Sequence, residues 1–293
     1  RSLANLTQVE TGFNRDRVLR LSLDVTPAGY KPDARVADLY ARIEARVAAL
    51  PGVEAASVSL FTFNEGSWTD DVTVLGASQA IANRTVSHNV VGNGYFKTMG
   101  IPLVAGRTFG PQDLATSDPV AVINETMARR MFPEGSPIGQ RFHIDGAPAS
   151  EQRLVVGVVK DAKLETLTED PQPADYLPYT QHVQYLGDFE VRVAGDPDAM
   201  VGAVRHAIGE GDRNVQLSGF TTLAAQVDRS VVSQRVVAQL STFFGLLALL
   251  LTSLGLYGLM SYAVTRRTNE IGVRVALGAR RSGVLWLVMR ENL

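Results

Sequence analysis

The side chains that most often carry enzyme chemistry are scattered along this sequence. No two histidines have the H-E-x-x-H or H-x-x-x-H spacing of a zinc site; the four are His88, His143, His182 and His206. The acidic pairs at 70–71 and 169–170 fall in predicted loops, where solvated charges are more common than a general acid and base. We therefore expect ordinary surface or strand histidines and no resident metal or cofactor. A pocket joining His143 or His182 to carboxylates would instead favour a membrane-bound hydrolase.

Motifs for nucleotide binding and for nucleophilic catalysis are also missing from the sequence. There is no G-x-x-x-x-G-K-[ST] phosphate loop and no G-x-S-x-G turn, and residues 135–139 (GSPIG) fit a plain turn better. The chain should therefore hydrolyse nothing by itself. A formal net charge of −2 with no basic, aromatic-rich patch argues against nucleic acid as a partner. Without cysteine, no disulfide can stabilise the fold.

The charges that most resemble a working site lie in the C-terminal segment 266–279 (RRTNEIGVRVALGA). Thr268 or Asn269 can cap a short helix there, with Glu270 at its positively polarised end. Gly278 can end that helix in a left-handed conformation. Such a short amphipathic helix either lies on anionic lipid or docks on a partner protein, and composition alone favours neither.

Directly before this segment, residues 236–265 contain no charged side chain. A transmembrane helix needs about 20 apolar residues, so this run predicts a membrane span. The alternative is a buried core helix, which would be unusually long for a globular core. Small residues in the run would let a second helix approach closely; they are Gly245, Ala248, Ser253, Gly255, Gly258 and Ser261.

The charge balance predicts which side of the membrane each part occupies. The residues before 236 carry 22 Lys+Arg against 28 Asp+Glu, whereas the later residues carry six arginines against Glu270 and Glu291. Arginines close to a span mark its cytoplasmic side. We therefore expect a bacterial inner-membrane protein with residues 1–235 in the periplasm and the residues after 265 in the cytoplasm.

Both ends of the sequence suggest further spans. The chain begins at Arg1 with neither a methionine nor an export signal, so we expect an earlier span that places the large part outside. At the other end, residues 284–289 (VLWLVM) are apolar enough to open another span.

The exported part predicts two β-α-β units of similar length, one near each of its ends. Asp33 is a candidate N-cap for the first helix, and Pro197 stands at the favoured first turn of the second. Together the units predict a split ferredoxin-like subdomain. Their elements are a strand at 17–26, a helix at 33–50 and a strand at 53–61, then a strand at 188–194, a helix at 197–209 and a strand at 214–220.

Between these units, residues 62–187 predict an inserted, mostly-β subdomain with short helices at 93–99 and 124–132. The predicted strands of this insertion lie at 71–75, 85–91, 101–105, 119–123, 140–144, 153–160 and 175–179.

From Thr221 the sequence pattern becomes helical. No Gly or Pro interrupts residues 221–244, and apolar and uncharged residues recur every three or four positions. We expect a stalk over 221–235 that continues into the span as one stiff helix. The residues predicted to share a face of the stalk are Leu223, Val227, Val231, Gln234 and Ala238.

Two sets of motifs resemble known families. The segment NEIGVRVALGA closely resembles the cytoplasmic segment that follows the second span of FtsX-like ABC transporter permeases, often E-I-G-[IV]-R-x-A-x-G-A. The exported part resembles the MacB-type periplasmic core domain, and similar sequences are frequent among acidobacterial-type orphan permeases. The matching phrases are 95–107 (YFKTMGIPLVAGR), 120–125 (VAVINE), 129–133 (RRMFP), 137–139 (PIG) and 176–179 (YLPY).

The resemblance implies a set of partners. In this family four spans are usual, and the cytoplasmic helix docks on a separate ABC ATPase subunit. A second permease copy, in a homo- or heterodimer, and membrane lipid are further implied partners, and a periplasmic adaptor or an outer-membrane channel is another candidate. By the same resemblance, the residues that dock on the ATPase are Glu270, Gly272, Arg274, Ala276 and Gly278.

The sequence thus predicts an α+β fold in three parts. Residues 1–235 form the periplasmic domain, 236–265 the span, and 266–293 the coupling segment with the start of another span. The predicted function is that of a non-catalytic permease subunit, which transmits ATP-driven movement of a partner to the periplasmic domain for efflux or export. The alternative is a membrane-anchored periplasmic binding or scaffold protein that works without an ATPase.

Overall fold

The computed structural model describes residues 11–76, 83–148 and 151–266. The chain divides into two compact units, Arg1–Val231 and Val232–Leu293. The predicted coupling segment after Arg266 lies outside the described residues.

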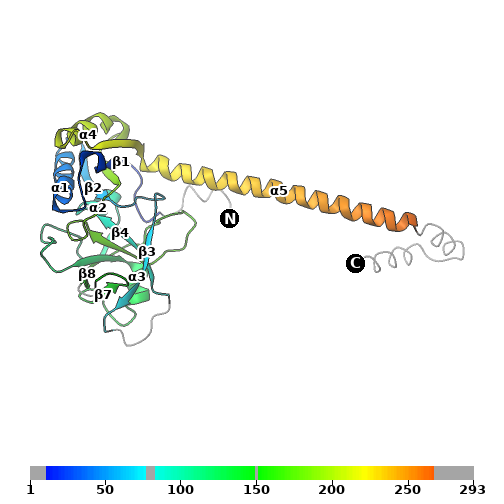
Figure 1. The fold of residues 1–293 in the computed structure, drawn as a ribbon, viewed down its shortest axis with the longest axis horizontal. Coiled ribbons are helices and arrows are strands. Elements are labelled where there is room, and N and C mark those ends of the chain that lie inside the picture. The colour runs from blue at the N-terminus through cyan, green and yellow to red at the C-terminus, as the bar shows by residue number, and fades with distance from the viewer. Residues whose placement is uncertain (1–10, 77–82, 149–150, 267–293) are drawn as a thin grey trace. The chain divides into compact units, whose positions relative to one another are not determined.

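The first unit opens with the predicted β-α-β unit (Figure 1), made of β1 (Val18–Asp24), α1 (Ala34–Ala48) and β2 (Val53–Ser59). A short 3-10 helix, η2 (Thr26–Ala28), follows β1. The Asp33 side chain accepts a hydrogen bond from the Arg35 backbone N–H, which confirms the predicted cap of α1. One face of α1 is buried, at Val36, Leu39, Tyr40, Ile43 and Val47.

The second predicted β-α-β unit is formed by β10 (Asp188–Val193), α4 (Pro197–Gly211) and β11 (Gln216–Thr222). The Asp196 side chain caps α4 by accepting a hydrogen bond from the Asp198 backbone N–H, and Pro197 occupies the first turn.

The strands of the two units interleave in the order β11-β1-β10-β2, and each neighbouring pair is antiparallel. Helices α1 and α4 contact each other and pack against these strands (Figure 1). These six elements follow the order β-α-β-β-α-β along the chain, with the long segment between β2 and β10.

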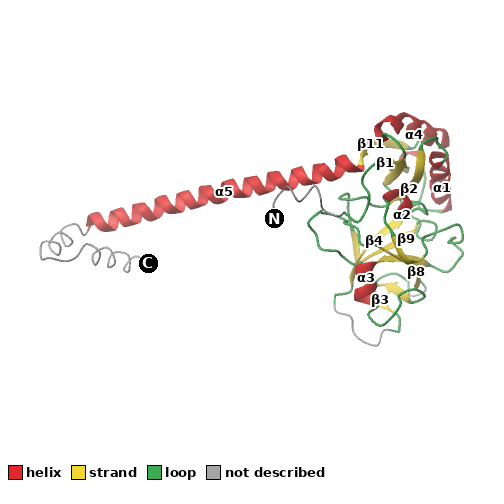
Figure 2. Cartoon of the chain, turned by 180° about the vertical axis from the view of Figure 1, so that it is seen from behind, coloured by secondary structure: helices red, strands yellow, loops and turns green. Residues whose placement is uncertain are grey.

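That segment contains every strand and helix predicted for it, displaced by a few residues at most, and Figure 2 shows its strands and loops. The strands are β3 (Trp68–Val74), β4 (Thr85–Val91), β5 (Leu103–Gly106), β6 (Val120–Asn124), β7 (Arg141–Ile144), β8 (Arg153–Val159) and β9 (Ala174–Pro178). The helices are α2 (Tyr95–Met99) and α3 (Glu125–Met131).

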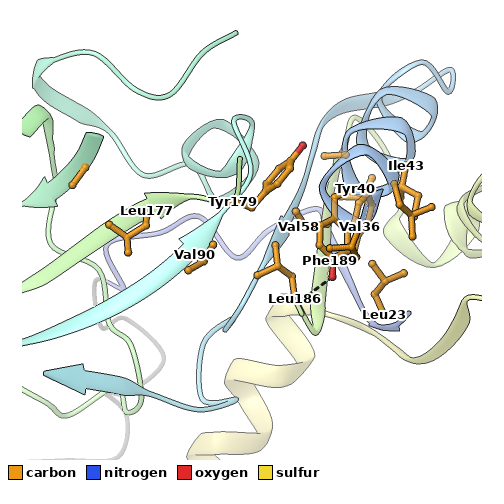
Figure 3. Close-up of a cluster of buried hydrophobic side chains, with 14 of the residues drawn as sticks. Leu23, Val36, Tyr40, Ile43, Val58, Val90, Leu177, Tyr179, Leu186 and Phe189 are labelled. Atoms are coloured by element: carbon orange, nitrogen blue, oxygen red, sulfur yellow. Dashed lines mark hydrogen bonds between the residues drawn. The ribbon is translucent and has the colours of Figure 1, made fainter. Parts of the chain in front are cut away.

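One sheet runs through both parts of the first unit. β2 joins β4 through the pair Ser59 and Val91, and β4 pairs in parallel with β9. A single buried cluster also extends from α1 to β4 and β9 (Figure 3), where the Tyr40 hydroxyl accepts a hydrogen bond from the Leu186 backbone N–H. The predicted division into a ferredoxin-like part and an inserted part therefore stays a prediction.

One prediction about this segment is wrong. The acidic pair Asp70 and Asp71 was expected in a loop but lies within β3. The strand accommodates both carboxylates because Asp70 accepts a hydrogen bond from Trp68 Nε1 at 2.6 Å and Asp71 accepts one from Thr85 Oγ1 at 2.8 Å.

The helix α5 (Leu223–Arg266) is unbroken over 44 residues, and it starts directly after β11. Its segment Gln239–Tyr262 is the one candidate membrane span among the described residues, with a mean hydropathy of 2.0 over its most apolar stretch and none of that stretch buried. This segment lies inside the predicted run 236–265.

Candidate functional site at the root of the long helix

The first turns of α5, residues 223–230, belong to the first unit, and we name them the helix root. Leu223 and Val227 are fully buried, and Gln226 and Ser230 are nearly so. This three-to-four-residue spacing is that of a helix with one face packed against a folded domain. The predicted stalk face is thus confirmed at Leu223 and Val227.

The sheet leads into the helix root without a linker. The last residue of β11, Thr222, accepts a hydrogen bond from the Ala225 backbone N–H at 3.1 Å and so caps the helix. Leu223 and Val227 join a buried cluster that also contains Phe13 and Phe63. Burying such side chains stabilises the root by roughly 1.5–3 kcal/mol each.

Gln226 connects the root to the loop between β2 and β3, residues 60–67, which we name the roof loop. Its Nε2 donates to the Phe63 carbonyl at 2.5 Å and to Glu65 Oε1 at 3.1 Å. The helix root makes a second contact through Asp228, which lies 3.2 Å from Arg15 in the segment before β1. The Asp228 side chain is 65% exposed, so this ion pair contributes little to stability.

A buried ion pair continues from the roof loop into the sheet. Arg20 on β1 lies 3.5 Å from Glu65 and donates through Nε to Asp188 Oδ1 of β10 at 2.9 Å. The other Asp188 oxygen accepts from the Thr62 backbone N–H at 3.1 Å. The root, the roof loop and the two central strands are therefore linked by one chain of polar contacts.

Glu190 lies two residues beyond Asp188 on the same strand and is completely buried. Burial, and secondly the Asp188 charge, hold the pKa of Glu190 well above its ordinary value. Its Oε1 accepts a hydrogen bond from the Ser59 hydroxyl at 2.6 Å. Burial also raises the pKa of Asp188, although Arg20 opposes that shift.

A second buried polar group arises from the register of β3, β4 and β9. Trp68 is paired with His88, and His88 is paired with Asp175. His88 Nδ1 lies 2.8 Å from Asp175 Oδ1, and both side chains are fully buried. Burial alone would lower the pKa of His88, but the Asp175 charge and hydrogen bond raise it. Sequence reasoning, which treated each histidine as ordinary, missed this pair.

Among the described residues, neither His182 nor His143 is seen to form a hydrogen bond or ion pair with a carboxylate. His182 Nδ1 lies 3.4 Å from the Arg153 guanidinium, and its ring stacks on Trp68 at 5.3 Å between centroids. Burial and the Arg153 charge lower the pKa of His182. His143 lies on β7, where it pairs with Thr73 of β3. The predicted docking residues Glu270, Gly272, Arg274, Ala276 and Gly278 lie outside the described residues.

Sequence reasoning also missed the chain of polar contacts that runs from Gln226 to Arg20 and Asp188. The spacing of the charged residues in the strands could have indicated it. β10 reads DFEVRV, so charged residues occupy alternate positions of a central strand and share one face. Arg20 interrupts the apolar strand β1 in the same way. Charges at these positions indicate buried partners, because an unpaired buried charge is very costly.

Comparison with known proteins gives two family matches. Residues 3–241 match the MacB-like periplasmic core domain, and residues 242–293 match the FtsX-like permease C-terminal region. The border between the matches falls inside α5, near the start of the candidate span.

Curated relatives and solved structures are similar at lower identity. The macrolide export ATP-binding/permease protein MacB of Agrobacterium fabrum is 32% identical over 74% of this chain and 34% of its own length. The ABC transporter permease YknZ of Bacillus subtilis is 27% identical over 70% of this chain and 52% of its own length. The chain thus spans about a third of the first relative and about half of the second. The crystal structure of the periplasmic region of MacB from Actinobacillus actinomycetemcomitans has a TM-score of 0.47 and 14% identity, covering 77% of this chain and 94% of that one.

Proposed function

The chain belongs to the FtsX-like ABC transporter permeases with a MacB-like periplasmic core domain, and from that premise we propose that it couples ATP hydrolysis by a partner subunit to movement of its own periplasmic domain. The chain itself is the non-catalytic membrane subunit. Residues 1–235 lie in the periplasm and the residues after 265 lie in the cytoplasm.

The observation that carries this proposal is the continuity of α5. A helix of 44 residues is about 65 Å long, and its 24-residue candidate span of about 36 Å exceeds the roughly 30 Å of a bilayer core. The same helix has its first turns buried in the sheet unit. The helix thus provides one unbroken helical backbone that links the candidate span to the first unit.

The cytoplasmic contact is proposed for the segment after Arg266. Glu270 and Arg274 are four residues apart, so on a helix both charges face one side and can pair with charges of an ATPase. Gly272, Ala276 and Gly278 are small enough to let the partner approach closely. Relatives whose names state macrolide export support efflux or export as the output of the movement.

The test is co-purification of the full-length protein with a bound ATPase, from native membranes into nanodiscs. We expect ATPase to accompany the wild type and to be lost, by at least about tenfold, in Glu270→Arg and in Arg274→Glu, because each reversal places like charges together. Matched controls are Glu291→Arg and Arg281→Glu, which make the same charge changes elsewhere in the segment and should retain the partner.

The opposite result would support another class of protein. A clean preparation without ATPase, unchanged by the two reversals, is expected of a membrane-anchored periplasmic scaffold that works alone. Equal loss in the control variants would show that the charge of the segment, and not the docking residues, holds the ATPase.

A further inference from the structure

Beneath the roof loop the first unit encloses a small cavity with a volume of about 40 Å³. Its walls are mainly apolar, with several aromatic side chains, and come largely from the roof loop, from strands β3, β4 and β9, from α2 and from residues 162–164. The aromatic side chains that line it are Phe13, Phe61, Phe63, Trp68, Tyr95 and Tyr176.

Polar atoms without partners gather at this cavity. In the part of the chain that the structure describes, His88 Nε2, Asp175 Oδ2 and Thr62 Oγ1 are buried with no hydrogen-bond partner, and all three residues line the cavity. Leaving a buried polar atom unpaired costs about 1–3 kcal/mol, so three at one cavity indicate a place where another molecule completes the bonds.

The His88–Asp175 pair at the cavity favours a molecule with a hydroxyl group. The raised pKa of His88 favours the imidazolium, whose charge is balanced by Asp175 at 2.8 Å. The other charged residue that lines the cavity is Lys163, which donates to the Glu169 carbonyl. His88 Nε2 and Asp175 Oδ2 lack partners, and a hydroxyl group, which both donates and accepts, can bond to both atoms.

We propose that this cavity is a binding site for a small phenol-like molecule, an aromatic ring with one hydroxyl group. The ring packs among the aromatic walls, and the hydroxyl bonds to the buried His88–Asp175 pair in place of water.

The size of the cavity determines how such a ligand enters. A space of 40 Å³ holds about three waters, whereas a cavity that holds benzene measures about 150 Å³. The roof loop must therefore move outward. Its bonds to the surroundings include Asn64 N–H to the Leu164 carbonyl at 2.9 Å and Gln226 Nε2 to the Phe63 carbonyl. Because Gln226 belongs to the helix root, entry of the ligand also breaks a contact between the root and the roof loop. The effect of this change on transport rests on the coupling function proposed above.

The test uses the full chain in nanodiscs, without ATPase or nucleotide, and fluorine NMR of para-fluorophenol. We expect saturable binding to the wild type. Binding should be at least about tenfold weaker in Asp175→Asn, which removes the charged acceptor, and in Ala162→Phe, which fills the cavity. Asp170→Asn makes the same chemical change at an exposed position and should bind like the wild type. The probe para-fluorotoluene, which lacks the hydroxyl, should bind at least about tenfold more weakly.

Trp68 supplies an independent readout, because the chain has two tryptophans and Trp286→Phe leaves Trp68 alone at the cavity. Its fluorescence should change with the same saturation curve, and its unliganded spectrum reports whether each variant is folded. Signals no larger than those of empty nanodiscs would overturn the proposal. Equal affinity of the wild type for both probes would also overturn the proposal, since a purely apolar cavity gives that result. Equal affinity of all folded variants for para-fluorophenol would do the same, since partitioning into the lipid gives that result.

Discussion

At the residue scale, the first unit contains several carboxyl groups that are buried or partly buried. Glu44 on α1 accepts hydrogen bonds from the Val58 backbone N–H at 2.9 Å and from the Tyr179 hydroxyl at 3.3 Å. Gly92 leaves the necessary space, since a Cβ there would stand 1.8 Å from Glu44 Oε1. Burial raises the pKa of Glu44 to about 7.

This shift predicts a loss of stability with rising pH. The unfolded chain releases the Glu44 proton near pH 4.5, whereas the folded chain keeps it to about pH 7. Between these values the folded state binds more protons, so the free energy of unfolding falls as pH rises, by up to about 3 kcal/mol. Glu44→Gln should remove this part of the fall, measured by urea unfolding at several pH values.

Glu165→Gln is the matched control, because Glu165 is exposed and its loss should leave the pH dependence as in the wild type. Identical pH curves for Glu44→Gln and the wild type would contradict the assignment.

Arg20 supports a second prediction at this scale. Its side chain is 9% exposed and Asp188 is 5% exposed, so Arg20→Met leaves a buried carboxylate without its cation. We expect a loss of about 3–5 kcal/mol in the free energy of unfolding, with part of it recovered in the double variant Arg20→Met/Asp188→Asn.

Chemical denaturation measures the loss, and Arg35→Met is the exposed control, with 69% of its side chain accessible. If the single and double variants lost the same amount, the ion pair would have no part in stabilising the fold.

At the element scale, local patterns predicted most helices and strands correctly. The cap at Asp33, the buried face of α1 and the absence of Gly and Pro at the start of α5 are all read from neighbouring residues. Which strands pair is not local, and neither the Trp68–His88–Asp175 row nor the Gln226 contact to Phe63 could be predicted. His88 and Asp175 are separated by 87 positions in the sequence, and Gln226 and Phe63 by 163 positions.

The same scale gives a test of α5 as a rigid connection. Gln234 lies in the continuous helix between the root and the candidate span, and a proline there removes a backbone hydrogen bond at a cost of about 3 kcal/mol. In Gln234→Pro, ATP should no longer change hydrogen–deuterium exchange in residues 60–67, although the ATPase still co-purifies. In Gln234→Ala the ATP effect should remain, and an ATP effect that survives the proline would mean that the movement is not carried by this helix.

At the scale of the whole molecule, the first unit should unfold as one body. The buried cluster joins Val36 and Leu39 of α1 to Val72, Met127 and Phe142 in the segment after β2. Because both parts share this core, we expect amides of α1 and of β6 to lose protection at the same urea concentration, measured by hydrogen exchange of the full chain in nanodiscs. Two separate transitions would instead support an independently folding insertion at 62–187.

The direct passage from β11 into α5 has a consequence for how related chains can vary. Each residue added to a helix advances it by about 1.5 Å and turns everything beyond it by about 100°. One extra residue between the root and the span would therefore rotate the membrane-facing surface by more than a quarter turn relative to the sheet. Seven extra residues would restore the azimuth to within about 20° and lengthen the helix by about 10 Å. We therefore expect length changes between the root and the span to come in steps close to whole heptads, which preserve the helical phase.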